Sequence, residues 1–406
     1  MIKASIVKSD ILSGFSPVVP EGCGVAAAPV SDMVIFPGFC DVHVHLREPG
    51  LSYKETIASG TRAAARGGYT DVFAMPNLDP VPDCPENLRP ELAAIARGAV
   101  IRVLPYGALT RGEKGREPAD IEGLAPFVAA FSDDGKGVQD EGMMREVMAR
   151  CRAVGKVLAA HCEDESLLFG GYIHDGAYAK ARGHRGICSE SEWRQIERDV
   201  RLAAETGVKY HVCHVSAKES VAIIRDAKKA GVDVTCETAP HYLLLDEGDL
   251  MEDGRFKMNP PLRGRRDREA LLEGIADGTI DMIATDHAPH TAEEKSRGLE
   301  KSPFGVVGIE TAFPLVWTGL VKTGVISTDR LIELMAIKPR QRFGLSLSGA
   351  DWSLWDLSEE YAIDPGEFLS MGRATPFEGR TVTGRCLMTV CGGRIAYEYR
   401  RNRSGS

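Results

Sequence analysis

The sequence lacks the marks of membrane, secreted and nucleotide-binding proteins. It contains no apolar run of about 18 residues, the length that a membrane-spanning helix needs. The N-terminus has no basic flank followed by an apolar segment, so a secretion signal is not indicated. No Gly-x-Gly-x-x-Gly turn follows a first strand. The net charge of -9 argues against nucleic acid as a partner. We therefore expect a cytoplasmic protein.

What is present is a repeated alternation of strand and helix patterns. The chain has 406 residues, of which 43% are hydrophobic, so a large core is possible. Apolar runs of strand length end near His45, Met75, Tyr106, Ser132, His161, Val215, Glu237 and Thr285. Helical periodicity is found at 54–65, 86–96, 142–154, 190–205, 217–230 and 268–275. Eight strands predict a (β/α)8 barrel of the TIM type, an α/β fold favoured here over an open doubly wound sheet.

The two chain ends have a different texture, with short β-like segments separated by Gly, Pro and Ser. Near the C-terminus, the segments 381–390 and 394–397 flank Gly392-Gly393 and predict a hairpin. Neither end alone offers enough strands for a stable sheet. We therefore predict a small β domain built from residues 1–36 and 345–406, beside a barrel domain of residues 37–344.

Candidate metal ligands gather where the predicted strands end. The alternation Val42-His43-Val44-His45 places both imidazoles on one strand face. Other candidates at strand ends are Asp133, Asp134, His161, His214 and Asp286. In a TIM barrel these ends form the active site, and imidazole and carboxylate are ligands of zinc. Four histidines with two carboxylates, Asp286 and one of Asp133 and Asp134, exceed the ligands of one tetrahedral ion, so we predict two metal ions.

Each candidate also has a structural interpretation. His161 or His214 could be a hydrogen-bonded core histidine, and Asp133 or Asp134 could cap the following helix. His211, three residues before His214, is expected to face away from the site and to be structural. Cys162 and Cys213 each adjoin a candidate histidine, but a neighbouring residue on a strand points to the opposite face, so neither is expected to bind metal. The ten cysteines form no Cys-x-x-Cys pair and are interpreted as buried thiols in a reducing compartment.

Seven motifs together identify a family. They are 41–50 (DVHVHLREPG), 75–77 (MPN), 131–135 (FSDDG), 161–164 (HCED), 214–216 (HVS), 257–263 (KMNPPLR) and 285–290 (TDHAPH). Over nearly the whole chain, the sequence resembles the bacterial (type I) dihydroorotases of the amidohydrolase superfamily. One departure is Ala239-Pro240-His241-Tyr242, where similar chains usually have Thr-Pro-His-His.

The resemblance implies a set of metal ligands. His43, His45 and Asp286 would hold one zinc ion, and His161 and His214 the second. Many relatives bridge the ions with a carboxylated lysine, but residues 125–133 contain no lysine. An aspartate bridge is therefore implied, and Asp134 is chosen over Asp133 on its spacing to His161 in similar sequences.

The resemblance also implies a reaction, the reversible interconversion of N-carbamoyl-L-aspartate and L-dihydroorotate in de novo pyrimidine biosynthesis. A hydroxide held between the metals would attack the cyclic amide, with Asp286 as general base and then general acid. Arg47, Asn77 and His290 would bind the substrate carboxylate, and Asn259 the ring amide. The glycine-hinged segment 298–308 is expected to close over the pocket. A homodimer and an association with aspartate transcarbamoylase are further implications.

Two other functions stay open. One is an allantoinase or hydantoinase-like cyclic amidohydrolase, with the same metals and a different pocket. Arg47 argues against it, because a hydantoin without a carboxylate would leave this cation unpaired. The other is a catalytically inactive homologue that serves as a scaffold for a partner enzyme. The presence of all six candidate ligands argues against that loss of function.

Overall fold

A parallel β-barrel forms the centre of the protein in the computed structural model, which describes residues 2–27 and 32–400. Within those residues, eight strands form one sheet in the order β4-β5-β6-β7-β8-β11-β12-β13. Their bounds are β4 (Phe39–Val44), β5 (Tyr69–Ala74), β6 (Arg102–Ala108), β7 (Ala130–Ser132), β8 (Val157–Ala160), β11 (Lys209–Val212), β12 (Val234–Thr238) and β13 (Met282–Ile283). The last and first strands approach each other at the edge, where the His45 N–H donates to the His287 carbonyl at 2.9 Å. The predicted barrel is confirmed.

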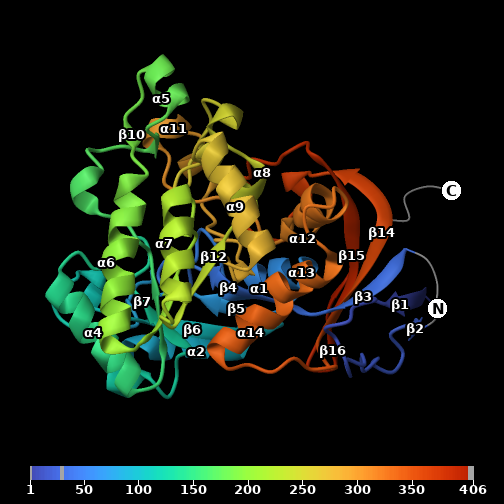
Figure 1. The fold of residues 1–406 in the computed structure, drawn as a ribbon. Coiled ribbons are helices and arrows are strands. Elements are labelled where there is room, and N and C mark those ends of the chain that lie inside the picture. The colour runs from blue at the N-terminus through green and yellow to red at the C-terminus, as the bar shows by residue number, and fades with distance from the viewer. Residues whose placement is uncertain (1, 28–31, 401–406) are drawn as a thin grey trace.

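Helices cover the outside of this barrel. They are α1 (Ile57–Arg66), α2 (Pro85–Gly98), α3 (Ile121–Leu124), α4 (Glu141–Ala153), α6 (Glu190–Thr206), α7 (Lys218–Lys229), α9 (Arg265–Asp277), α12 (Ala312–Val316), α13 (Thr328–Ile332) and α14 (Lys338–Phe343). In Figure 1, α4, α6, α7 and α9 lie side by side on one flank of the barrel. The six predicted helices are all present, with ends within a few residues of the expected ones. No helix in the described ranges has the length and apolar character needed to cross a membrane.

A six-stranded sheet lies at the opposite side of the molecule (Figure 1). Its order is β16-β15-β14-β3-β1-β2, so strands from both chain ends pair in one sheet, as predicted. The bounds are β1 (Ile2–Ile6), β2 (Val25–Ala27), β3 (Met33–Pro37), β14 (Trp352–Ala362), β15 (Thr381–Cys391) and β16 (Arg394–Glu398). The sequence analysis did not predict β14, although this strand joins the two ends by pairing with both β3 and β15.

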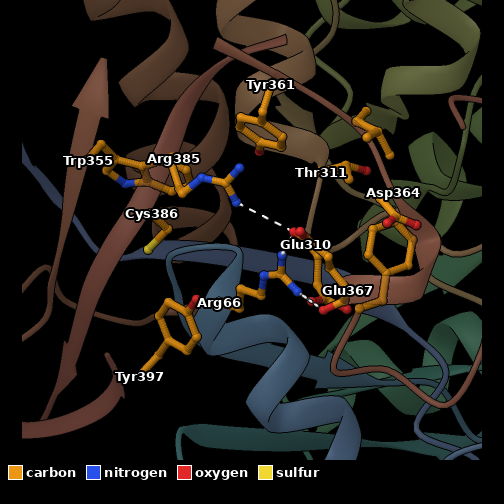
Figure 2. A pocket seen from close by; sticks show the side chains of 12 residues that line it. Arg66, Glu310, Thr311, Trp355, Tyr361, Asp364, Glu367, Arg385, Cys386 and Tyr397 are labelled. Atoms are coloured by element: carbon orange, nitrogen blue, oxygen red, sulfur yellow. Dashed lines mark hydrogen bonds and ion pairs between the residues drawn. The ribbon is translucent and has the colours of Figure 1, made fainter. Parts of the chain in front are cut away.

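Aromatic rings and ion pairs join this sheet to the barrel. Trp355 of β14 lies against Phe313 of α12, with ring centroids 4.1 Å apart. Beside them, Arg66 of α1 pairs with Glu310 at 3.2 Å and Arg385 of β15 lies 3.7 Å from Glu367 (Figure 2). The cavity among these side chains has about 20 Å³, room for about one water molecule. This junction is therefore a structural contact and does not accommodate a substrate.

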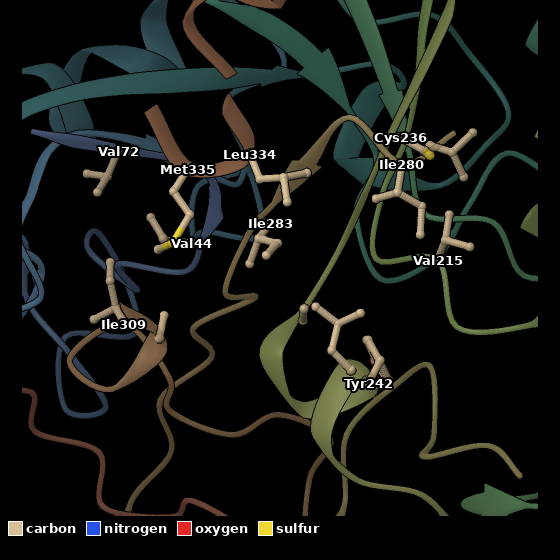
Figure 3. Packing of buried hydrophobic residues seen from close by; sticks show 14 of the residues in the cluster. Val44, Val72, Val215, Cys236, Tyr242, Ile280, Ile283, Ile309, Leu334 and Met335 are labelled. Atoms are coloured by element: carbon tan, nitrogen blue, oxygen red, sulfur yellow. The ribbon is translucent and has the colours of Figure 1, made fainter. Parts of the chain in front are cut away.

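The barrel interior is filled with apolar side chains below its carboxyl end. Val42, Phe73, Tyr106 and Met282 belong to this interior cluster, and Phe343 of α14 packs against it. Outside the strands, Leu334 and Met335 of the π-helical turn η6 (Glu333–Ile337) belong to the large buried cluster that also contains Val44, Val72 and Ile283 (Figure 3). Because the interior is packed, only the carboxyl end of the barrel leaves room for a site.

Short elements in the loops surround that end. They are β9 (Ile173–His174), β10 (Gly186–Ile187), α5 (Ala177–Arg182), α8 (Pro240–Leu244), α10 (Ala292–Lys295), α11 (Gly298–Lys301), and the short helical turns η1 (Arg111–Glu113), η2 (Glu165–Leu167), η3 (Glu247–Asp249) and η4 (Gly254–Phe256). Two further turns, η5 (Trp317–Val321) and η7 (Pro365–Glu367), lie against the six-stranded sheet instead. The long excursion between β8 and α6 was not predicted from the sequence.

Candidate metal centre

All six predicted metal ligands converge at the carboxyl end of the barrel, and all are buried. They are His43, His45, Asp134, His161, His214 and Asp286. Each follows or ends a different strand, except for the two on β4. Side chains that are far apart in the sequence therefore meet because parallel strands end at the same rim.

The first group brings His43 and His45 to Asp286. The Asp286 Oδ1 atom lies 3.5 Å from His43 Nε2 and 3.1 Å from His45 Nε2. One ligand atom from each of the three residues lies within 4.8 Å of the others. This spacing suits one divalent ion.

In the second group, the rings of His161 and His214 face each other, and Asp134 lies beside them. The two ring nitrogens that face each other, His161 Nδ1 and His214 Nε2, are 3.0 Å apart. Asp134 Oδ1 lies 3.6 Å from His214 Nε2 and 3.4 Å from His43 Nε2. Its Oδ2 lies 3.5 Å from His45 Nε2. Asp134 therefore lies between the two groups of histidines, in the place of a bridging carboxylate.

Asp133 has a different environment. Its carboxylate accepts hydrogen bonds from the backbone N–H groups of Leu109 and Thr110, at 2.8 and 3.0 Å, and from the Thr110 hydroxyl. These contacts tie the end of β7 to the loop after β6. The geometry therefore favours Asp134 over Asp133 as the shared ligand.

The chemistry of the cluster fits a bound cation. His43 Nε2 and Asp134 Oδ1 are buried and have no hydrogen-bond partner in the described structure. Buried polar atoms without a partner are costly, and a divalent ion would satisfy both. Burial alone would raise the pKa of Asp134, but the neighbouring His43 and His214 rings outweigh it and hold the pKa well below its usual range. The carboxylate is thus ionised, as a metal ligand must be.

Three residues of the site have left-handed backbone angles. The φ values are 61° at Arg47, 34° at His214 and 47° at Asp286. Non-glycine residues in this region cost roughly 1–3 kcal/mol each and persist where the surroundings hold them. Strain at three strand ends around one cluster is typical of a functional site.

A cavity of about 170 Å³ opens above the cluster. Its lining includes Arg47, Asn77 and Asn259, three of the four predicted substrate contacts, together with Phe304 and Gly305 of the predicted closing segment. Arg47 is buried, and its Nε donates to the Pro289 carbonyl at 3.3 Å. The cavity therefore combines one fixed cation with the metal-ligand cluster.

Two asparagines line the cavity. Asn77 Nδ2 donates to the Asp134 carbonyl at 2.6 Å, and Asn259 Nδ2 donates to Glu163 Oε1 at 3.0 Å. Both Oδ1 atoms are buried without a partner. Because the amide nitrogens are engaged, the oxygens are free to accept N–H groups of a ligand.

His290, the fourth predicted contact, lies behind Arg47. Its Nε2 lies 2.8 Å from the Phe304 carbonyl and 3.4 Å from Arg47 Nη2, and its Nδ1 lies 3.1 Å from Lys54 Nζ. Burial and the charges of Arg47 and Lys54 lower the pKa of His290 to about 3, so the ring is neutral. In this arrangement both ring nitrogens already face protein groups, and His290 supports Arg47 and the closing segment.

Sequence reasoning missed two buried carboxylates behind the histidines. Glu237 Oε1 lies 2.7 Å from His43 Nδ1, and Glu163 Oε2 lies 3.6 Å from His161 Nε2. Both residues belong to features that the sequence analysis had identified: Glu237 lies at a predicted strand end, and Glu163 lies in the motif that contains His161. Neither residue was singled out, because its role depends on a contact with a histidine of another segment, which the local pattern does not show.

Cys213 shows the same irregularity. As expected, Cys162 points away, with its Sγ near the Tyr210 hydroxyl at 3.2 Å. Cys213 was expected to point away from the candidate ligands, and this was wrong. Its thiol lies in the barrel interior, within 4.8 Å of ligand atoms of His43 and Glu237. The left-handed backbone at His214 breaks the strand alternation there. Burial raises the pKa of Cys213 to about 12, so the thiol is neutral.

Glu113, in the loop after β6, gives a pH-dependent prediction. It is 4% exposed, and burial, with a contribution from Asp133, raises its pKa to about 8. Between the usual carboxyl pKa and about 8, Glu113 is protonated in the folded protein and ionised in the unfolded chain. The free energy of unfolding therefore falls as the pH rises through this range. We expect Glu113→Gln to raise the thermal midpoint relative to wild type by more at pH 8 than at pH 5. Thermal unfolding at both pH values, with exposed Glu117→Gln as control, checks this; an equal difference at both would contradict it.

Comparison with known proteins places this geometry in a family. The family described as "Dihydro-orotase-like" matches residues 32–220. The protein named "Dihydroorotase" of Shouchella clausii (strain KSM-K16) is 53% identical over 377 residues, covering 91% of this chain and 88% of that protein. The protein of the same name from Bacillus cereus (strain AH820) is 49% identical over 409 residues, covering 98% and 96%.

Solved structures show the same architecture. The L-hydantoinase (dihydropyrimidinase) from Arthrobacter aurescens superposes with a TM-score of 0.81 at 26% identity, covering 93% of this chain and 88% of that one. The dihydropyrimidinase from Brevibacillus agri NCHU1002 has a TM-score of 0.76 at 22% identity, covering 92% and 87%, and supports the fold alone.

Proposed function

Because this chain belongs to the dihydroorotase family, we propose that it catalyses the reversible interconversion of N-carbamoyl-L-aspartate and L-dihydroorotate, in de novo pyrimidine biosynthesis in the cytoplasm. The observation that carries the proposal is the combination of a six-residue metal-ligand cluster and buried Arg47 around one cavity. A cyclic amide with a carboxylate substituent needs both features.

We propose two zinc ions in this centre. His43, His45 and Asp286 would hold one ion, His161 and His214 the other, and Asp134 would bridge them. Two ligand-atom groups, His43 with His45 and Asp286 and His43 with Asp134 and His214, support this assignment. The 3.0 Å approach of His161 to His214 and the unpartnered atoms of His43 and Asp134 support it further. When bound, such ions acidify a water molecule and polarise the amide carbonyl.

Asp286 is the proposed proton carrier. Its Oδ1 lies among the metal-ligand nitrogens, and the residue lines the cavity. Burial alone would raise its pKa, but a hydrogen bond with His45 and the nearby histidines hold it below its usual value, so the free carboxylate is ready to accept a proton. It would take a proton from the attacking water and donate it to the ring nitrogen as the C–N bond breaks. Ring closure would use the same residue in the reverse order.

The other cavity residues would bind and orient the substrate. The Arg47 guanidinium can pair with the carboxylate in a bidentate arrangement. Asn77 would join Arg47 at the carboxylate through its second Nδ2 hydrogen. The free Oδ1 atom of Asn259 can accept an N–H group, which a dihydropyrimidine ring supplies. Phe304 and Gly305 would cover the ring from the closing segment.

An assay with four substrates tests the proposal. Purified protein loaded with zinc should interconvert dihydroorotate and carbamoyl aspartate far faster than it opens hydantoin or allantoin. Removal of metal with a chelator should abolish turnover, and zinc should restore it, with the metal content measured in each sample. Faster opening of hydantoin or allantoin would identify the alternative cyclic amidohydrolase. A folded protein that retains no zinc after dialysis without chelator would support the scaffold.

The remaining expectations concern assembly. We propose that the chain forms a homodimer and associates with aspartate transcarbamoylase, and that residues 1–36 and 345–406 form one domain beside the barrel of residues 37–344. Sedimentation velocity of the protein, alone and mixed with that enzyme, tests the two associations. A monomer in the sample of this protein alone would contradict the homodimer. Unchanged sedimentation of both proteins in the mixture would contradict the association with aspartate transcarbamoylase.

A further inference from the structure

Glu237 is a buried carboxylate at the end of β12, directly below the proposed metal centre. It is 1% exposed, and its carboxylate contacts β4, β11 and the turn that follows β11. Its Oε1 lies 2.7 Å from His43 Nδ1 on β4, and its Oε2 lies 3.0 Å from His211 Nε2 on β11. Its Oε1 also accepts the backbone N–H of His214 at 3.3 Å. One side chain thus contacts a candidate ligand from each of the two groups.

The contact with His43 determines which ring nitrogen is free. A carboxylate can only accept, so Nδ1 of His43 must carry the proton that lies between the two residues. In the neutral ring, the other nitrogen, Nε2, then has a free lone pair. Nε2 is the atom that lies near Asp134 and Asp286 and lacks a hydrogen-bond partner. Glu237 therefore presents His43 to the cluster in the tautomer that can bind a cation.

The contact with His214 acts on the backbone. His214 has a φ of 34°, a conformation that non-glycine residues rarely adopt. Two hydrogen bonds from β12 hold this part of the chain: the one from the His214 N–H to Glu237 Oε1, and one from the Val215 N–H to the Glu237 carbonyl at 2.8 Å. Both fix the turn that directs the His214 ring toward His161.

The orientation of the carboxylate is itself held from behind. His211 Nε2 contacts Glu237 Oε2, and His211 Nδ1 lies 2.8 Å from the Thr235 hydroxyl. His211, Thr235 and Glu237 thus form a hydrogen-bonded row below the site, with His211 and Glu237 fully enclosed. His211 is not among the proposed metal ligands, and its role is then to hold the Glu237 carboxylate in its orientation.

We propose that Glu237 is a positioning residue for both metal positions: it fixes the tautomer and ring direction of His43 and the backbone turn that orients His214. This inference rests on the metal centre proposed above. Buried carboxylates that accept from a ligand histidine typically change metal affinity by roughly 10- to 100-fold when they are replaced. A carboxylate that only stabilised the barrel would change the unfolding temperature and leave metal affinity unchanged.

The test compares Glu237→Gln with Glu91→Gln, which removes another enclosed glutamate, on α2, far from the ligands. Zinc affinity is measured by competition with a chromophoric chelator. The tautomer of His43 is measured by ¹⁵N NMR of the metal-free protein at a pH at which the ring is neutral, with His43→Gln used to assign the signal. We expect Glu237→Gln to weaken zinc binding roughly 10- to 100-fold and to populate both His43 tautomers. Glu91→Gln should match wild type, and excess zinc should restore much of the turnover of Glu237→Gln.

Two results would overturn the inference separately from the proposed function. Unchanged zinc affinity and an unchanged Nδ1–H tautomer in Glu237→Gln, with zinc-binding wild type, would show that Glu237 has no positioning role. Wild-type protein that binds no zinc would instead refute the metal centre itself. If Glu237→Gln does not fold, Glu237→Asp serves in its place, because it keeps the charge and shortens the reach. Wild-type zinc affinity in that variant would equally contradict the inference.

Discussion

Asp286→Asn is expected to reduce turnover of dihydroorotate by at least about 10³-fold while most of the zinc stays bound. General acid–base catalysis by one positioned side chain contributes roughly 10²- to 10⁴-fold, and Asp286 would act in both proton transfers. An amide has nearly the same shape but cannot accept or carry the proton. Five of the six candidate ligands are unchanged, so the cluster should still hold metal. Steady-state kinetics in both directions and metal analysis of the same sample measure the two effects.

A matched control for this variant is Asp281→Asn. Asp281 precedes β13 at the amino end of the same strand, where it pairs with Lys228 at 2.6 Å, on the side of the barrel away from the cavity. This variant should keep wild-type turnover. Loss of both metal ions from Asp286→Asn would show that the residue acts mainly as a ligand, and turnover within about tenfold of wild type would refute the proton-carrier role.

The sequence was sufficient to predict the barrel because its signal is local and repeated. Each strand is a short apolar run, and the helix after it shows its own periodicity, as at α6 and α7. The ligand cluster could be predicted for the same reason, since parallel strands deliver their carboxyl ends to one rim. His43, His161 and Asp286 could therefore be placed together without any knowledge of their distances.

What escaped prediction depends on contacts between distant segments. The first five residues of β14, 352–356, are all buried where the sheet meets the barrel, and burial alternates only in the second half of the strand. No local period distinguishes such a strand from other apolar runs. Cys213 was assigned to the wrong face for another reason, since the left-handed backbone at the next residue, His214, breaks the strand alternation at the rim. The places where regular patterning fails are thus the places where the site is built.

Arg47→Lys is expected to raise the KM for dihydroorotate about 10- to 100-fold, with a smaller effect on kcat. Hydrogen bonds to charged groups contribute roughly 1.5–3 kcal/mol, and lysine replaces a planar two-point contact by a single flexible ammonium. Arg47 is buried and fixed by the Pro289 carbonyl, so its fork is already oriented before the substrate binds. Steady-state kinetics with dihydroorotate and carbamoyl aspartate measure the change, and Arg62→Lys, on the exposed face of α1, provides the control.

The decisive comparison uses a substrate without the carboxylate. If Arg47 recognises that group, the slow opening of hydantoin should have the same KM in Arg47→Lys as in wild type, because hydantoin makes no contact with the fork. The preference for dihydroorotate over hydantoin would then fall by the factor by which its own KM rises. An unchanged KM for dihydroorotate would exclude carboxylate capture by Arg47. An equal rise for both substrates would show that the substitution disturbs the strained turn at φ 61° and the cavity as a whole, and specificity would have to come from the asparagines.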